Sequence, residues 1–289
     1  MDKARQLAIL GMVVSGCLAA LKITAGWFGR SAAVSADGFE SAADVFTSGL
    51  VLVGLTIAAR PADENHPYGH GRIEILTGFL LGIILFGAGC TISWHGLTGS
   101  GDETIPPASW VIWAMLISIA AKSWLVTVKF RYGRKIGSSS LTADAANDAV
   151  DILSGVVALA GVATALINPG RFLRADHYGA FVVGIIVVAS GIRVMYQSAM
   201  QLMDTMPDEN TMTRIREVAL SVRDVAGVEK CFARKTGLQY HVDLHLEVDP
   251  EMTVLASHDV ACRVRDSIRD QLPWVADVLV HVEPAPRTI

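Results

Sequence analysis

The chain contains the stretch ADGFESAAD at residues 36–44, and at residues 143–151 it repeats the same polar pattern as ADAANDAVD. Both stretches lie inside otherwise apolar segments. Ionisable side chains are costly inside a membrane and usually mark an ion pathway there. The repeat therefore predicts a membrane protein with a buried cation site between two of its helices.

Composition agrees with a polytopic membrane protein. The 289 residues are 52% hydrophobic and only 18% charged, which is too apolar for an ordinary soluble domain. Charged side chains crowd the chain from residue 207 onward, so we expect a membrane domain over residues 1–206 and a soluble tail over residues 207–289. The net charge of −4 and the lack of a Lys/Arg block give no indication of a nucleic-acid partner.

Apolar runs long enough to cross a membrane predict an all-α membrane domain of six helices. A span needs about 20 apolar residues, and such runs cover residues 6–28, 33–59, 75–98, 108–130, 141–167 and 177–201. Lys3 and Arg5 precede the first run as in a signal peptide, but no small-residue cleavage site follows, so we expect a retained first helix.

Basic residues indicate the orientation. They flank the second-to-third connection at Arg60 and Arg72, and they crowd the fourth-to-fifth connection over residues 129–135. Cytoplasmic loops carry such an excess of Lys and Arg, although Arg171 and Arg174 in an outer loop run against it. We therefore expect both termini in the cytoplasm, and the simplest membrane is a bacterial inner membrane.

The tail has the pattern of a small α+β, ferredoxin-like domain. Helical apolar stripes cover residues 209–223 and 255–272, and strands are expected at residues 228–234, 239–248 and 278–282. The order of the last three elements is a β-α-β unit. Four scattered cysteines without CxxC spacing fit small apolar residues better than a disulfide framework.

The repeated pattern places oxygen donors on two helix faces. Residues four apart share a face, so Glu40 and Asp44 pair on the second span, as Asn147 and Asp151 do on the fifth. One divalent ion bound by all four would offset much of the cost of burying the carboxylates. Helix–helix hydrogen bonding is the alternative. Asp37 and Asp144, one turn earlier, are read either as an entry step for the ion or as structural partners of neighbouring helices.

These residues resemble the cation diffusion facilitator (CDF) family, in which the second and fifth helices each contribute two ligands at i and i+4. The stretch DENHPYGHGRIE at residues 63–74 is similar to the family's loop motif. The tail is similar from QLMD at residues 201–204 to HVEP at residues 281–284. The resemblance implies a homodimer that exports a divalent metal from the cytoplasm in exchange for protons.

The ligand set departs from that of zinc-transporting members, which commonly have His or Asp at the Glu40 position and His at the Asn147 position. Carboxylate and amide oxygens suit harder ions than imidazole does, so Mn²⁺ or Fe²⁺ is favoured over Zn²⁺. With no imidazole in the set, a carboxyl group of Glu40, Asp44 or Asp151 is expected to carry the counter-transported proton.

By resemblance, Asp63, His66 and His70 form the family's loop metal site; the alternative is a polar turn with incidental histidines. The resemblance also suggests a salt bridge between Arg72 and Asp204 at the dimer interface.

In the tail, four residues match positions that bind two metal ions in zinc-exporting relatives, while Glu229 stands where those relatives have a histidine. A metal sensor and a plain dimerisation module are both open readings of the tail. The four matching residues are His245, His258, His281 and Glu283.

Three functional classes compete. A secondary metal/proton antiporter is favoured, and the chain has no GxxxxGK[ST] phosphate loop that would indicate ATP as the energy source. A transport-poor metal-binding scaffold of the same fold is the main alternative, and a cation channel is the third. A metal-dependent enzyme is disfavoured because no candidate nucleophile or base accompanies the repeated pattern.

Overall fold

The computed structural model describes residues 2–58, 60, 63–99, 105–136, 139–237 and 239–286. Asp144 of the second polar stretch has a described backbone but lies outside the described side chains. The chain forms two compact units, one of Met1–Leu50 with Leu80–Met195 and the other of Val51–Phe79 with Tyr196–Ile289. The second unit thus combines the tail with the loop that joins the second and third long helices. The boundary at residue 206 stays a prediction.

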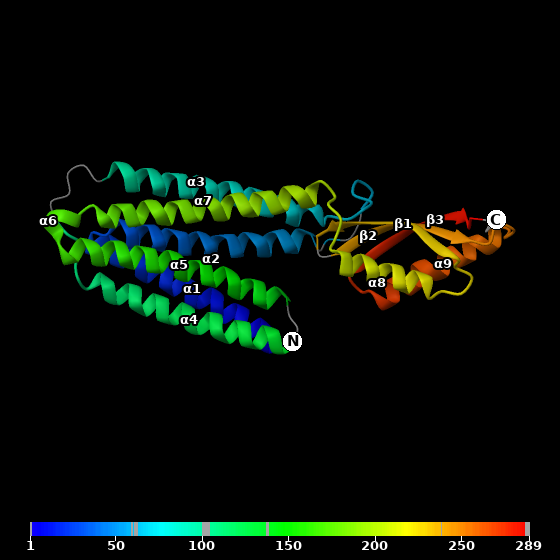
Figure 1. The fold of residues 1–289 in the computed structure, drawn as a ribbon, viewed down its shortest axis with the longest axis horizontal. Helices are drawn as coiled ribbons and strands as arrows, with labels where there is room; N and C mark the ends of the chain where they lie inside the picture. The colour runs from blue at the N-terminus through cyan, green and yellow to red at the C-terminus, as the bar shows by residue number, and fades with distance from the viewer. Residues whose placement is uncertain are drawn as a thin grey trace. The chain divides into compact units, whose positions relative to one another are not determined.

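A long helix covers each of the six predicted spans (Figure 1). Five of the described helices are long and apolar enough to cross a membrane. The helix over the second predicted span, residues 33–59, is not among them, so its crossing stays a prediction. This helix carries three carboxylates in its first half. The helices are α1 (Asp2–Gly29), α2 (Ala32–Ala58), α3 (Arg72–Thr98), α4 (Val111–Ile136), α5 (Ser139–Ile167), the short α6 (Pro169–Phe172) and α7 (Ala175–Leu202).

The connection expected over residues 131–140 is shorter in the structure. Helix α4 continues through Arg131, Arg134 and Lys135 to Ile136, and α5 already begins at Ser139. Arg and Lys are good helix formers, so the charges that end the apolar run do not end the helix.

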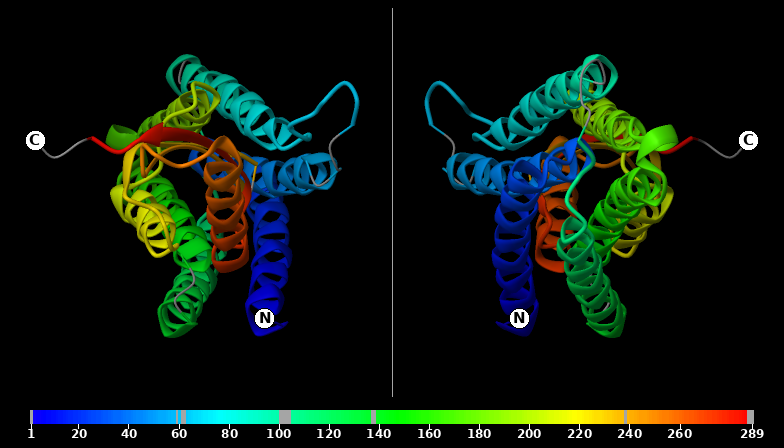
Figure 2. Two further views of the ribbon diagram at one scale, coloured as in Figure 1. Left: turned by 90° about the vertical axis from the view of Figure 1, so that its right-hand side faces the viewer. Right: turned by 90° about the vertical axis from the view of Figure 1, so that its left-hand side faces the viewer.

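Some helices of the first unit pack with their backbones close together at glycine residues. Helix α4 packs against both α1 and α5, and end-on views place α3 on the opposite side of the bundle from the N-terminal end of α1 (Figure 2). A Cβ atom on Gly89 of α3 would lie 2.6 Å from the Val188 nitrogen of α7. Small residues allow membrane helices to approach this closely. The start of α7 also holds the start of α2, because Asp176 accepts hydrogen bonds from Ser31 Oγ (2.7 Å) and Ala32 N (2.6 Å).

The tail is the predicted α+β domain. Strand β2 pairs antiparallel with β1 and parallel with β3, and α9 connects β2 to β3, which confirms the β-α-β unit. Buried side chains of both helices and the sheet form its core, among them Ile215, Leu244, Leu246 and Ile268. The elements are α8 (Glu209–Leu220), β1 (Gly227–Thr236), β2 (Gln239–Val248), α9 (Val254–Gln271) and β3 (Val275–Pro284).

Candidate metal transport site

Three of the four predicted transport ligands converge inside the first unit. Glu40 and Asp151 are each 6% exposed, and Asp44 is half-buried. The side chains of Asp44 and Asp151 are close enough to interact, and the Glu40 carboxyl is close enough to interact electrostatically with both. Helices α2 and α5 therefore bring three oxygen donors into one neighbourhood, and oxygen donors suit hard divalent cations. Among the described residues, however, the groups with ligand atoms all within 4.8 Å of one another are those of the loop and the tail.

The fourth predicted ligand is placed differently. Asn147 is exposed, whereas its neighbour Asp148 is 5% exposed. Residues three and four positions before Asp151 lie on nearly the same helix face, so a small rotation decides which of the two points inward. Sequence reasoning passed over Asp148, although its i, i+3 spacing to Asp151 was a usable signal.

Two lysines of α4 reach into the carboxylate cluster, and sequence reasoning missed this role for both. Lys122 Nζ lies 2.6 Å from Asp151 Oδ2 and 2.7 Å from Asp148 Oδ1. Lys129 Nζ lies 2.5 Å from Asp148 Oδ2. Lys129 is therefore a buried partner of a carboxylate within α4, and the orientation of the chain stays a prediction.

Asp37 has a structural partner as well. Its Oδ2 lies 2.7 Å from Lys22 Nζ of α1, and its Oδ1 accepts a hydrogen bond from Ser154 Oγ of α5 (3.0 Å). Lys22 also donates to Ser41 Oγ (3.0 Å). These contacts join α1, α2 and α5, which favours the structural reading of Asp37 over an entry step for the ion.

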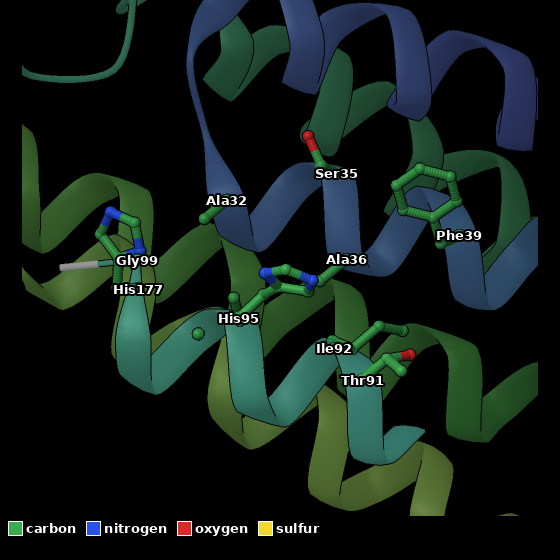
Figure 3. Close-up of a pocket in the computed structure, with 11 residues that line it drawn as sticks. Ala32, Ser35, Ala36, Phe39, Thr91, Ile92, His95, Gly99 and His177 are labelled. Atoms are coloured by element: carbon green, nitrogen blue, oxygen red, sulfur yellow. The ribbon is translucent and has the colours of Figure 1, made fainter. Parts of the chain in front are cut away.

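A cavity of about 510 Å³ between α2, α3 and α7 offers a different chemistry (Figure 3). Its walls are mostly apolar or small side chains such as Ala36 and Phe39, and its polar groups include the imidazoles of His95 and His177. The described lining residues include no carboxylate. The carboxylate cluster is therefore the better candidate for binding a hard divalent cation.

The predicted loop site is assembled in the second unit. His66 Nδ1 lies 3.0 Å from Asp63 Oδ1, and His70 Nε2 lies 3.4 Å from Asp63 Oδ2. Hydrogen bonding from His66 lowers the pKa of the Asp63 carboxyl below its ordinary value. One ligand atom from each residue lies within 4.8 Å of the others, so a single ion can contact all three.

The tail cluster contains three of its four predicted residues. His245 Nδ1 lies 2.5 Å from Glu283 Oε1, and His281 Nε2 lies 3.6 Å from the same oxygen. Hydrogen bonding with Glu229 and with His245 holds the pKa of Glu283 below its ordinary value. Glu229 thus belongs to this cluster, while His258 lies on α9 with its Nε2 3.5 Å from Cys262 Sγ.

Arg72 and Asp204 form an ion pair within the chain. Arg72 Nη2 donates to both carboxylate oxygens of Asp204, at 2.9 Å and 3.2 Å. The pair joins the start of α3 to the end of the last long helix, and both side chains are at least 40% exposed. Its role at a dimer interface stays a prediction.

Comparison with known families identifies the class of protein. Residues 8–203 match the model of the cation efflux transmembrane domain, and residues 207–285 match the model of the cation efflux protein cytoplasmic domain. The chain belongs to the cation efflux family, the cation diffusion facilitators. It is a multi-pass integral membrane protein of a family of metal transporters.

Individual relatives are similar over nearly the whole chain. Manganese efflux system protein MneP of Bacillus subtilis (strain 168) is 30% identical over 97% of this chain and 96% of its own length. Metal tolerance protein C1 of Arabidopsis thaliana is 30% identical over 98% of this chain, which spans 63% of that longer protein. Among solved structures, the cadmium form of the MamM CTD D249E variant is 28% identical, covering 27% of this chain and 98% of that one, with a TM-score of 0.27.

Proposed function

We propose that this protein is a proton-coupled antiporter that moves a divalent metal ion out of the cytoplasm. The convergence of Glu40, Asp44 and Asp151 from two helices carries the proposal. Isolated carboxylates in a low-dielectric site are costly, and a bound cation offsets that cost.

The charge of the cluster fits an ion of charge +2. The described side chains contribute five carboxylates and three ammonium groups, which leave two negative charges when all are ionised. The carboxylates are Asp37, Glu40, Asp44, Asp148 and Asp151, and the ammonium groups belong to Lys22, Lys122 and Lys129.

Manganese or iron is the proposed cargo in preference to zinc. The three converging ligands are all carboxylates, and carboxylate oxygens suit Mn²⁺, whereas imidazole and thiolate suit Zn²⁺. The similarity to a manganese efflux protein supports the same choice. Protons taken up by these carboxyl groups after the metal leaves would complete the exchange.

The proposed assembly is a homodimer in the inner membrane with both termini in the cytoplasm. The match of the tail to the cytoplasmic domain of cation efflux proteins supports this orientation. In the tail, His245, His281 and Glu283 fit a regulatory metal ion by donor type and spacing. Metal binding there would bias the membrane domain through linkage.

Flux into sealed vesicles tests the proposal. Purified protein is reconstituted in liposomes with an imposed pH gradient, and uptake of Mn²⁺, Fe²⁺ and Zn²⁺ is followed with a trapped metal-sensitive dye. We expect saturable Mn²⁺ flux that collapses when the gradient is removed and that is lost in Asp44→Asn and Asp151→Asn.

Three outcomes would redirect the assignment. Equal flux in the wild type and both variants would favour the metal-binding scaffold, and non-saturable flux would favour a channel. Flux of Zn²⁺ alone would overturn the proposed cargo.

A further inference from the structure

Lys122 contacts one residue of the transport site and two residues outside it. Its Nζ donates to Asp151 Oδ2 (2.6 Å), to Asp148 Oδ1 (2.7 Å) and to Ser15 Oγ (2.9 Å). The side chain is 3% exposed. Burying an ammonium group costs several kcal/mol unless carboxylates surround it, so these partners fix its position.

Asp148 and Ser15 hold Lys122 independently of Asp151. Asp148 is itself anchored, because its second oxygen accepts from Lys129 Nζ at 2.5 Å. Gly11 of α1 leaves the space for this contact, since a Cβ there would lie 2.7 Å from Lys129 Nζ. Lys122 can therefore give up Asp151 while Asp148 and Ser15 still accept hydrogen bonds from its ammonium group.

A divalent ion and the Lys122 ammonium cannot share Asp151 without a penalty. A metal ion bound between Asp44 and Asp151 would lie a few Å from Nζ, where like charges repel strongly because the surrounding dielectric constant is low. Coordination of the metal by Asp151 would also occupy the carboxylate oxygen that now accepts the hydrogen bond from Lys122. The two cations are alternative partners of one carboxylate.

We propose that Lys122 is a built-in competitor of the transported metal, an inference that depends on the proposed function of the carboxylate site. Arrival of the metal moves Lys122 off Asp151 toward Asp148, and its return to Asp151 helps to expel the metal. The lysine is a positioning residue that lowers the affinity of the site so that the ion can leave. Efficient turnover requires a site that releases its cargo as well as binding it.

Metal affinity is the discriminating measurement, because loss of a competitor and loss of a structural contact change it in opposite directions. Mn²⁺ binding to the detergent-purified full-length protein is measured by titration calorimetry for the wild type, Lys122→Gln and Lys122→Arg. We expect Lys122→Gln to bind Mn²⁺ roughly tenfold more tightly or better, because a nearby positive charge is removed. Lys122→Arg keeps the charge and should stay close to wild type.

Transport kinetics give the second readout. In vesicles, Lys122→Gln should show a lower KM for Mn²⁺ together with a lower maximal rate, since tighter binding slows release. Lys22→Gln is the matched control, a buried lysine whose carboxylate partner Asp37 is outside the predicted ligand set. Its effect on Mn²⁺ affinity should be the smaller of the two.

The outcomes separate this inference from the proposed function. If Asp151→Asn binds Mn²⁺ as tightly as the wild type does, the metal does not bind at the proposed transport site. If Asp151→Asn abolishes Mn²⁺ binding, the proposed transport site stands. If Lys122→Gln then leaves Mn²⁺ binding unchanged or weakens it, the role of Lys122 as a competitor is overturned.

Discussion

Lys22 of α1 and Asp37 of α2 form an ion pair of 2.7 Å in which both side chains are at most 2% exposed. Removing one partner of a buried pair leaves an uncompensated charge and typically costs about 3–5 kcal/mol. We therefore expect Lys22→Met to destabilise the protein by an amount in this range. Thermal unfolding of the detergent-purified protein measures the effect.

A control variant and a double variant test whether the Lys22–Asp37 ion pair causes the loss of stability. Lys135→Met, at the exposed end of α4, should leave the unfolding midpoint unchanged. The double variant Lys22→Met with Asp37→Asn should recover much of the lost stability, because neither charge is then left alone. A midpoint for Lys22→Met equal to that of Lys135→Met would show that the ion pair does not contribute.

The pair between Arg72 and Asp204 should affect assembly more than stability. Exposed ion pairs contribute about 0–1 kcal/mol to folding, so neither Arg72→Asp nor Asp204→Arg should shift the unfolding midpoint much. If the pair sits at a dimer interface, each charge reversal should raise the monomer fraction, and the double reversal should restore the dimer. Mass photometry in detergent counts both species.

The tail offers a matched pair for this experiment. Arg263 Nη2 lies 2.9 Å from Asp224 Oδ2, and both side chains are similarly exposed. Arg263→Asp should leave the dimer fraction at the wild-type value. A dimer fraction that responds equally to both reversals would mean that net charge, and no particular contact, controls assembly.

Asn147 and Asp148 differ in exposure, which predicts which of them faces the metal. Asn147 is exposed, whereas Asp148 is 5% exposed. Asn147→His adds an imidazole, which suits Zn²⁺, at a position outside the buried carboxylate cluster, so we expect the ratio of Zn²⁺ to Mn²⁺ flux to stay close to that of the wild type. Vesicle uptake with both ions measures the ratio, and Asn168→His, in the turn before α6, is the control. A ratio that rises roughly tenfold, equivalent to about 1.4 kcal/mol, in Asn147→His alone would show that this position reaches the ion.

Patterns within single helices and strands could be predicted from the sequence, and pairings between helices could not. Apolar runs located the long helices, and the i, i+4 spacing located Glu40, Asp44 and Asp151. Each buried lysine, by contrast, is one charge in an apolar run, which also fits a lysine near the end of a span. Only the fold shows that Lys122 lies beside Asp151. The choice between Asn147 and Asp148 depends on the rotation of α5, which packing sets.

The spacing of the ligand atoms in the tail predicts which of its histidines bind metal. His245, His281 and Glu283 offer ligand atoms within 4.8 Å of one another, whereas His258 lies on α9 beside Cys262. We expect His245→Ala to weaken the binding of Zn²⁺ or Mn²⁺ to the tail at least tenfold, and His258→Ala to change it little. Calorimetry in an Asp44→Asn, Asp151→Asn background removes the signal of the transport site. Equal losses in both variants would mean that the tail binds metal through an arrangement that includes α9.

The start of α8 predicts a pH dependence of the tail. Asp208 caps this helix by accepting hydrogen bonds from Thr211 N (2.9 Å) and Thr211 Oγ1 (3.1 Å), and these bonds lower the pKa of Asp208 below its ordinary value of 3.8. A group whose pKa is lower in the folded state stabilises the fold above its unfolded pKa, and the stabilisation is lost as the pH falls through the folded value. The cap should therefore be fully effective at neutral pH and fail below about pH 3.8.

Asp208→Ala should accordingly weaken hydrogen-exchange protection of the α8 amides at pH 7, and its difference from wild type should shrink as the pH falls below 3.8. Asp208→Asn should keep most of the protection at pH 7, because Asn is as good an N-cap as Asp, and it should lose less of it in acid. Exchange is measured on the full-length protein by mass spectrometry, with variant and wild type compared at the same pH. A difference between Asp208→Ala and wild type that persists undiminished in acid would show that the ionised carboxylate is not the source of the cap's stability.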